Sequence, residues 1–124
     1  MKLFHWPDAG NHVVMIVRGH IDVSGFEQIA QEAAKVCRPL AHCKVIIDLQ
    51  DGTYRLELEH IHAFVRGLKP DVWPVAHRIA LVSSSELNDY DQLLLLRNVL
   101  SKHGCNVAAF RDPKVATSWL ADPV

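Results

Sequence analysis

Val45-Ile46-Ile47-Asp48-Leu49 is a short, almost wholly apolar run that is rich in β-branched residues. The turn residues Asp51-Gly52-Thr53 follow it, and an amphipathic pattern then extends from about Arg55 to Leu68. A run of this length and composition is typical of a strand that is buried on both faces of a parallel sheet. The succession of buried strand, turn and helix predicts an α/β fold.

Three further apolar runs have the same character and predict neighbouring strands, at Val13–Val17, Ile79–Val82 and Val107–Phe110. Leu3–Trp6 precedes the first of them, and the two are separated by Pro7–Asn11, a cluster of residues that favour turns. The sequence therefore predicts an N-terminal hairpin whose first strand is a short edge strand.

Amphipathic helices are expected between the strands. Ser24 and Glu27 have the spacing of a capping box, and Pro39 ends the helix that follows them. The other helices are expected at about 55–68, from about Asn88 to a cap at Gly104, and after the cap residue Asp112, with Val115, Ala116, Trp119 and Leu120 facing inward. The predicted order is ββαβαβαβα, which indicates one α/β domain over residues 1–124 with a mixed, mostly parallel five-stranded sheet and about four helices.

Composition and charge exclude several classes of protein. The chain has 124 residues, a formal net charge of -1 and 49% hydrophobic residues, which is typical of a folded domain without an electrostatic preference for nucleic acid. No apolar run approaches the ~18 residues of a membrane span, and the N-terminus lacks the pattern of a signal peptide. We therefore expect a cytoplasmic protein without membrane insertion. Cys37, Cys43 and Cys105 form no recognisable motif and are expected to be reduced thiols.

Four segments of the chain resemble one protein family. Val17-Arg18-Gly19-His20-Ile21-Asp22, before a capped helix, is similar to the Gly-x-(Ile/Leu)-Asp segment of STAS domains, and residues 45–49 resemble their central strand. Arg78–Val82 and Phe110–Leu120 resemble the ends of the SpoIIAA-like branch, which is sometimes grouped as STAS/Sec14-type domains. The resemblance extends over nearly the whole chain and depends on the order and spacing of the four segments.

The resemblance implies a small, non-enzymatic interaction or regulatory domain with a protein partner. Some members of the family are anti-sigma-factor antagonists, which bind a protein kinase and are switched by phosphorylation of a serine in an Asp-Ser-(Ser/Thr)-(Gly/Ala) motif. The matching stretch here is Asp51-Gly52-Thr53-Tyr54-Arg55, in which the serine is absent and Thr53 is the nearest hydroxyl. The phosphorylation switch is therefore not carried over to this chain. Other relatives are thought to hold a hydrophobic ligand, so carriage of a small lipid-like molecule is the alternative function.

Two loops follow the carboxyl ends of predicted parallel strands and form the candidate contact surface. One contains Asp51, Thr53, Tyr54 and Arg55, and the other is Ser83-Ser84-Ser85. Open α/β sheets bind ligands at this edge, in front of helix N-termini. The sequence therefore predicts that a partner or ligand contacts these residues, with ordinary turn formation as the alternative.

The titratable residues do not predict an active site, a metal centre or a cofactor. His60 and His62 would point about 200° apart on a helix, so they cannot share a metal ion. Glu59 and His62 have a suitable spacing but form an incomplete set of ligands. Ser83–Ser85 lacks the glycines of a nucleophile elbow or a phosphate loop. We therefore expect no catalytic residue and no bound metal or cofactor.

A candidate apolar pocket lies around the second predicted helix. Leu58, Phe64 and Trp73 lie on this helix or in the segment that follows it. A pocket between them could hold a small hydrophobic ligand, and the alternative is that the rings close the hydrophobic core.

The third predicted helix contains one leucine outside its apolar face. With Leu93 placed at 0°, the inward arc begins with Leu95 at about 200°, whereas Leu94 falls at about 100°, between Arg97 and Asn98. Leu94 is therefore predicted to lie in the middle of the polar face. In that position it is a candidate contact for a partner or for self-association as a homodimer.

Overall fold

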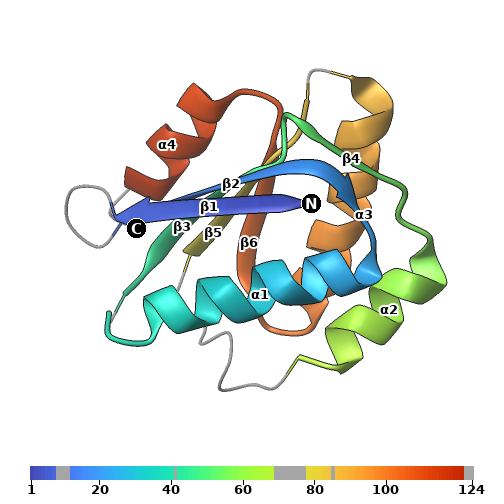
Figure 1. Cartoon of the computed structure of the whole chain (residues 1–124), viewed down its shortest axis with the longest axis horizontal. Helices are drawn as coiled ribbons and strands as arrows, with labels where there is room; N and C mark the ends of the chain where they lie inside the picture. Colours follow the sequence, from blue (N-terminus) through green and yellow to red (C-terminus); the bar gives the residue numbers. More distant parts are fainter. Residues whose placement is uncertain (8–11, 41, 69–77, 85, 122–124) are drawn as a thin grey trace.

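The computed structural model describes residues 1–7, 12–40, 42–68, 78–84 and 86–121. A central sheet carries helices on both of its faces (Figure 1). The elements in chain order are β1 (Lys2–Pro7), β2 (His12–Ile21), α1 (Val23–Cys37), β3 (Lys44–Asp48), β4 (Gly52–Tyr54), α2 (Leu58–Arg66), β5 (Arg78–Val82), α3 (Leu87–Lys102), β6 (Asn106–Phe110) and α4 (Pro113–Ala121). None of the helices in the described ranges is long and apolar enough to cross a membrane.

The sheet is mixed and mostly parallel, as predicted. Its main strands lie in the order β1-β2-β3-β5-β6, in which β1 runs antiparallel to β2 and the other neighbours run parallel. β4 pairs in parallel with the end of β2, where Gly19 lies opposite Gly52 and Ile21 lies opposite Tyr54. The α/β architecture with four helices and the N-terminal hairpin are therefore confirmed.

The sheet has six strands, whereas five were predicted. Residues 51–53 were expected to form a turn, but Gly52–Tyr54 forms β4. A strand of three residues has no periodicity of its own, so the local pattern could not reveal it. The same pairing explains why β2 continues to Ile21 instead of ending at Val17.

The two faces of the sheet are covered unequally. α1, α2 and α3 cover one face and enclose the main hydrophobic cluster, to which the central strand contributes Val45, Ile47 and the following Leu49. α4 lies on the other face and packs on β3, β5 and β6 (Figure 1). Ile46 and Asp48 point to that side and are only half-buried. The central strand is therefore buried on one face and partly covered on the other, rather than fully buried on both.

The first turn of α1 differs from the prediction. The carboxylate of Asp22 accepts a hydrogen bond from the backbone N–H of Gly25 at 2.7 Å, so Asp22 caps a helix that begins at Val23. Ser24 was predicted to cap this helix together with Glu27. Aspartate and serine are both good capping residues, and the extended end of β2 brings Asp22 to the helix first.

The exposed leucine of α3 is Leu95 rather than Leu94. Leu93, Leu96 and Leu100 are buried, Leu94 is half-buried, and Leu95 keeps 43% of its surface exposed. The buried arc is narrower than predicted, and Leu95, at about 200°, lies next to the exposed residues Asp91 and Lys102, at about 160° and 180°. The placement of Leu94 in the middle of the polar face, and of Leu95 in the inward arc, was therefore wrong.

α4 follows the prediction with one exception. Asp112 caps the helix, because its carboxylate accepts a hydrogen bond from the backbone N–H of Lys114 at 2.9 Å. Ala116 and Leu120 face inward and are fully buried. Val115 was also expected to face inward, but 52% of its surface is exposed, because only a narrow stripe of this short helix contacts the sheet.

Cys37 and Cys43 form a disulfide bond, and Cys105 is a free, buried thiol. The prediction of three reduced thiols was therefore wrong for the first two. Pro39 follows the end of α1, and the chain then turns back, so that the last residue of the helix meets the residue before β3. The pair is separated by six positions and matches no common cysteine motif, so the tertiary path of the chain is needed to recognise it.

Alkylation of the denatured chain without reductant is expected to label Cys105 and to leave Cys37 and Cys43 unlabelled, as peptide mass spectrometry would show. Reduction should lower the free energy of unfolding by about 2 kcal/mol, because the closed loop is short and removes a modest amount of entropy from the unfolded chain. In urea denaturation, the Cys37→Ala/Cys43→Ala variant should not respond to reductant. Labelling of all three cysteines before reduction would contradict the disulfide bond.

Candidate functional site

The first part of the candidate site is β4 and its flanking residues. Asp51, Thr53 and Arg55 are exposed at the edge of the sheet where the parallel strands end. Tyr54 points to the opposite side, because side chains alternate along a strand. Its ring is buried and packs edge-on against the ring of Phe26, with 5.9 Å between the centroids. Three of the four predicted contact residues in this segment are therefore accessible, and Tyr54 belongs to the core.

The second part of the candidate site is the segment after β5. Ser83 is fully buried, and its hydroxyl donates to the carbonyl oxygen of Ser84 at 2.8 Å, with the carbonyl oxygen of Phe110 at 3.4 Å. The backbone N–H of Ser83 also donates to the carbonyl oxygen of Phe110, at 2.9 Å. Ser83 therefore joins the end of β5 to β6 and is not presented to a ligand. Ser84 is half-buried, and Ser85 lies outside the described residues.

Asp89, in the first turn of α3, connects the two predicted segments. Its carboxylate accepts a hydrogen bond from the hydroxyl of Ser84 at 2.6 Å, and its carbonyl oxygen accepts one from the hydroxyl of Tyr54 at 3.4 Å. The Ser84 hydroxyl in turn accepts a hydrogen bond from the backbone N–H of Glu86 at 3.2 Å. The start of α3 therefore joins the two segments.

Gln92 is a site residue that sequence reasoning missed. Its side-chain oxygen accepts a hydrogen bond from the backbone N–H of Leu56 at 2.5 Å. This contact fastens the segment between β4 and α2 to the second turn of α3. The one sequence signal was a polar residue beside the apolar arc of a helix, which does not by itself identify a partner. The hydrogen bond of Gln92 and the contacts of Asp89 together hold β4 and the segment after it against α3.

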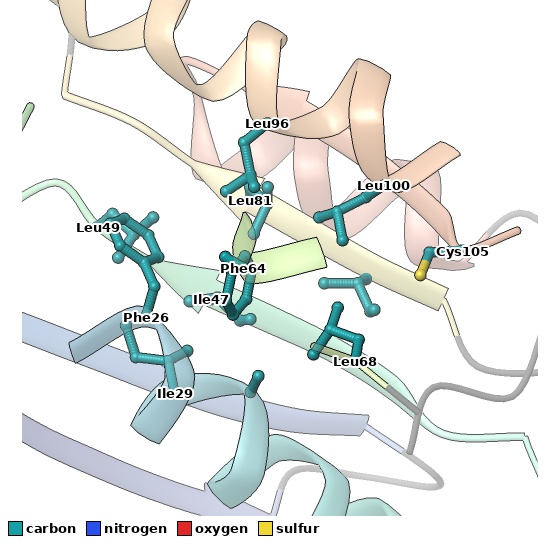
Figure 2. A pocket seen from close by; sticks show the side chains of 12 residues that line it. Phe26, Ile29, Ile47, Leu49, Phe64, Leu68, Leu81, Leu96, Leu100 and Cys105 are labelled. Carbon is teal, nitrogen blue, oxygen red and sulfur yellow. The ribbon is translucent and has the colours of Figure 1, made fainter. Parts of the chain in front are cut away.

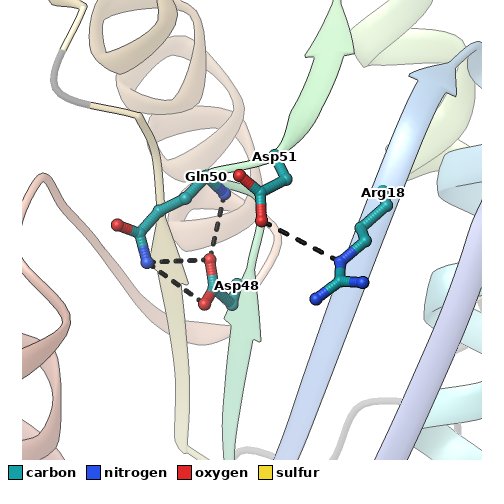
Figure 3. Close-up of polar contacts among 4 residues, drawn as sticks. All are labelled: Arg18, Asp48, Gln50 and Asp51. Atoms are coloured by element: carbon teal, nitrogen blue, oxygen red, sulfur yellow. Dashed lines mark hydrogen bonds and ion pairs between the residues drawn. The ribbon is translucent and has the colours of Figure 1, made fainter.

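Arg18 and His20, on β2, extend the exposed surface. β2 and β4 are paired, and His20 lies directly opposite Thr53. Figure 3 shows the guanidinium of Arg18 directed toward the carboxylate of Asp51, with Nε 3.9 Å from Oδ2. Both side chains are more than half exposed, and an ion pair of this kind contributes about 0–1 kcal/mol. Both charges therefore remain available to a partner at little cost in stability.

Asp48 and Gln50 shape the turn that leads into β4. The backbone N–H and the side-chain Nε2 of Gln50 both donate to Oδ1 of Asp48 at 3.0 Å, and Nε2 also lies 3.1 Å from Oδ2 (Figure 3). Gly52 follows this turn at a close approach of two segments, because a Cβ atom there would lie 2.8 Å from the Cδ1 atom of Ile21. The carboxylate of Asp48 is therefore engaged in forming the turn.

An apolar cavity of about 40 Å³ lies between the sheet and the three helices of the main face (Figure 2). It is lined by hydrophobic side chains and one thiol, which belong to Phe26, Ile29, Ala30, Ile47, Leu49, Phe64, Leu68, Ile79, Leu81, Leu96, Leu100 and Cys105. Pockets that hold drug-sized ligands enclose roughly 300–1,000 Å³. The cavity is therefore much smaller than a lipid-like ligand requires.

Of the predicted pocket residues, the structure places one at the cavity and one away from it. Phe64 lines the cavity, as expected. Leu58 does not line it, because it is the first residue of α2 and 53% of its surface is exposed. The helix was expected to begin near Arg55, but the hydrogen bond from Leu56 to α3 keeps the preceding residues extended. Trp73 lies outside the described residues.

Glu57, Glu59 and His60 form a small exposed cluster. Their potential ligand atoms lie within 4.8 Å of one another. The sequence had pointed instead to Glu59 with His62 as an incomplete ligand pair. All of these side chains are exposed, as acidic side chains commonly are without binding an ion, so the cluster does not indicate a metal centre.

Two buried groups have shifted acidities. Burial raises the pKa of Tyr54 above its ordinary value of 10.0, and the negative charge of Asp89 raises it further. Burial also raises the pKa of the Cys105 thiol. Both groups therefore stay protonated at neutral pH, which suits a structural role in the core and does not favour nucleophilic attack.

No protein-family model matches the chain, and no curated protein sequence matches it. The resemblance to STAS domains therefore stays a prediction that depends on the four sequence segments. The observed α/β fold is consistent with it.

Tyr54→Phe is expected to lower the free energy of unfolding at neutral pH by about 1 kcal/mol or less, because it removes one long hydrogen bond. The folded protein holds the phenol proton more tightly than the unfolded chain does. The contribution of Tyr54 is therefore complete below a pH of about 10 and decreases as the pH rises above that value. The measurement is urea denaturation at neutral pH and at about one unit above pH 10. Between these two pH values the free energy of unfolding should fall less for Tyr54→Phe than for the wild type.

Tyr90→Phe provides the matched control, because Tyr90 is the other tyrosine of the chain and is half-buried. A wild-type protein and a Tyr54→Phe variant with the same dependence on alkaline pH would contradict the link between burial and proton affinity.

Proposed function

We propose that the chain is a non-enzymatic, STAS-like interaction domain that binds a protein partner at the carboxyl edge of its sheet. The contact residues are Asp51, Thr53 and Arg55, with Arg18 and His20 beside them on β2. One observation carries the proposal. The polar side chains at this edge are exposed, and hydrogen bonds to α3 hold the residues beside them in place.

The support makes the exposed residues suitable for recognition. The segment after β4 is held to α3 through Gln92, and β4 itself through Asp89. A partner that binds a fixed surface does not have to order it, which lowers the entropic cost of association. Opposite charges at Asp51 and Arg55 favour a partner with a complementary arrangement of charges.

The contacts of the serines favour binding over catalysis. The hydroxyl of a catalytic nucleophile must be free to face a substrate. The hydroxyl of Ser83 contacts carbonyl oxygens in the interior of the protein, and that of Ser84 contacts the carboxylate of Asp89 while it caps the backbone of Glu86. Both hydroxyls therefore have structural roles that leave little capacity for a reaction. Thr53 is exposed, but its sequence context differs from that of the phosphorylated serine in the antagonists.

Photo-crosslinking tests this surface directly. With p-benzoylphenylalanine in place of Thr53, irradiation of producing cells should yield a discrete adduct with one partner protein. Arg55→Glu in the same chain should lower the adduct yield several-fold, because it reverses a charge of the contact surface. Immunoblotting and mass spectrometry of the adduct provide the measurement.

Ser101 is the control position for the photoreactive residue. It is exposed near the far end of α3, away from the edge at which α3 begins. The same adduct from position 101, or no adduct from position 53 in cells of the native host, would count against the proposed surface.

The apolar cavity supports a second candidate function, which is carriage of a small hydrophobic ligand. Its lining is entirely suited to hydrocarbon, but a volume of about 40 Å³ requires α2 to move before a lipid-like molecule could enter. The small volume is the reason why we rank this function below partner binding.

Native mass spectrometry of the protein purified from its host is expected to give the mass of the chain without an added small molecule. The physical reason is that a cavity of about 40 Å³ has no room for one. A reproducible added mass that organic extraction removes would contradict this expectation and favour the carrier function. Phe64→Ala, which enlarges the cavity, is the comparison variant, because it should increase the uptake of a small apolar probe such as benzene.

A further inference from the structure

Strand β1 lies at one end of the sheet, and one of its edges is unpaired among the residues that the structure describes. Its six residues, Lys2–Pro7, pair with β2 on one side, and within the described ranges no other strand pairs with them. An open edge of this kind exposes a row of backbone N–H and C=O groups that can pair with another chain. Natural proteins protect such edges with charges, proline or bulges, and β1 has Lys2 and Pro7 only at its two ends.

The middle of β1 carries two exposed aromatic side chains. Leu3 packs against the main hydrophobic cluster, and His5 pairs with Glu32 of α1 at 2.8 Å. Phe4 and Trp6 therefore point to the opposite face, where 47% and 44% of their surfaces are exposed. α4 lies on that face but packs on β3, β5 and β6, and does not cover β1 (Figure 1).

We propose that a second copy of this chain pairs with β1, so that the two sheets join into one across a two-fold axis. The strands run antiparallel, with His5 opposite His5 of the second copy and Phe4 opposite its Trp6. A symmetric pair must place the same face of each strand on the same side. Centring on His5 satisfies this condition and brings both aromatic side chains of each copy into cross-strand contact.

The other symmetric registers that pair aromatic residues are less favourable. Centring the axis on Trp6 would place the two copies of Trp6 opposite each other and leave Phe4 opposite position 8, beyond the end of β1, so it provides one aromatic contact. Centring the axis on Phe4 would place the two copies of Phe4 opposite each other. It would also leave each Trp6 opposite Lys2 of the other chain. This register therefore has one aromatic contact between the strands, whereas the register centred on His5 has two. The chemistry of the strand therefore selects the register centred on His5.

Charge also favours the antiparallel arrangement. β1 has Lys2 as its one fully charged residue and contains no acidic residue. In the proposed register the two copies of Lys2 lie about 20 Å apart, given ~3.4 Å per residue, which is more than a Debye length at physiological salt. A parallel pair would bring them side by side.

The size of the contact predicts a weak dimer. Phe and Trp bury about 150–250 Å² each when fully covered, so the exposed parts of four such rings supply roughly 350 Å². Paired backbone edges add to this area, but the total stays below the roughly 1,200–2,000 Å² of stable interfaces. The dimer should therefore dissociate on dilution.

Sedimentation velocity over a hundredfold range of concentration tests the proposal. The wild-type chain should shift from monomer to dimer as the concentration rises. Phe4→Lys and Trp6→Lys should each stay monomeric, because they place a charge at the paired strands. Their thermal unfolding should stay close to that of the wild type, since nearly half of each side chain is already exposed.

Leu95→Lys and Val115→Lys are the matched controls, because each replaces an exposed apolar residue of another element, on α3 or on α4. Both should dimerise like the wild type. Loss of the dimer in Leu95→Lys but not in Trp6→Lys would assign self-association to α3 and overturn the proposal. A wild-type chain that is monomeric at every concentration would overturn it as well.

Cysteine cross-linking tests the register. Under mild oxidation His5→Cys should form a covalent dimer, whereas Trp6→Cys, which lies opposite Phe4 of the other copy, should not. A covalent dimer from Phe4→Cys without one from His5→Cys would place the axis on Phe4 and overturn the proposed register.

Discussion

The length of strand β2 is the constraint on which the rest of the structure depends. Its ten residues pair with β1 along one side, and with β3 and then β4 along the other. The strand supplies Met15 and Val17 to the core, and its last residues, Gly19–Ile21, pair with β4. If β2 ended at Val17, β4 would have no partner strand. Thr53 and Tyr54 would then lie in a loop, with nothing to direct one outward and the other inward.

The parts of the fold that could be predicted from the sequence are those whose signal lies in neighbouring residues. The β-branched run at 45–49 and the capping residue Asp112 are examples, because strand burial and helix capping depend on a few adjacent positions. The pairing of β4 with β2 and the bond between Cys37 and Cys43 depend on the path of the chain in space. The buried face of α3 was ambiguous for another reason: four consecutive leucines, at 93–96, cover about 300° of a helix and define no single apolar direction.

In the candidate site, too, some features could be predicted from the sequence and others depend on the tertiary structure. The position of both loops at one edge of the sheet could be predicted, because the carboxyl ends of parallel strands lie at the same edge. The sequence could not show which hydroxyls would be used for internal contacts, since that depends on where α3 begins. Asp89 accepts hydrogen bonds from the hydroxyls of Ser84 and Tyr54. Arg18, which lies on a strand far away in the sequence, completes the exposed surface. The contact surface is therefore a product of the tertiary pairing and not of one loop.

Unequal helix coverage accounts for the exposed face beside β1 and β2, to which both proposed surfaces contribute a residue. A helix is about 10 Å across and strands are about 4.8 Å apart, so one helix covers roughly two strands. Three helices suffice for one face of this sheet, whereas on the other face α4 is the one described helix, and it packs on β3, β5 and β6 rather than on β1 and β2. Phe4 and Arg18 share that open side, with the guanidinium 5.8 Å from the ring centroid. A second copy paired along β1 would extend the sheet in its own plane, whereas a partner at Thr53 approaches the end of the strands. Because the two directions differ, both contacts can form on the same molecule.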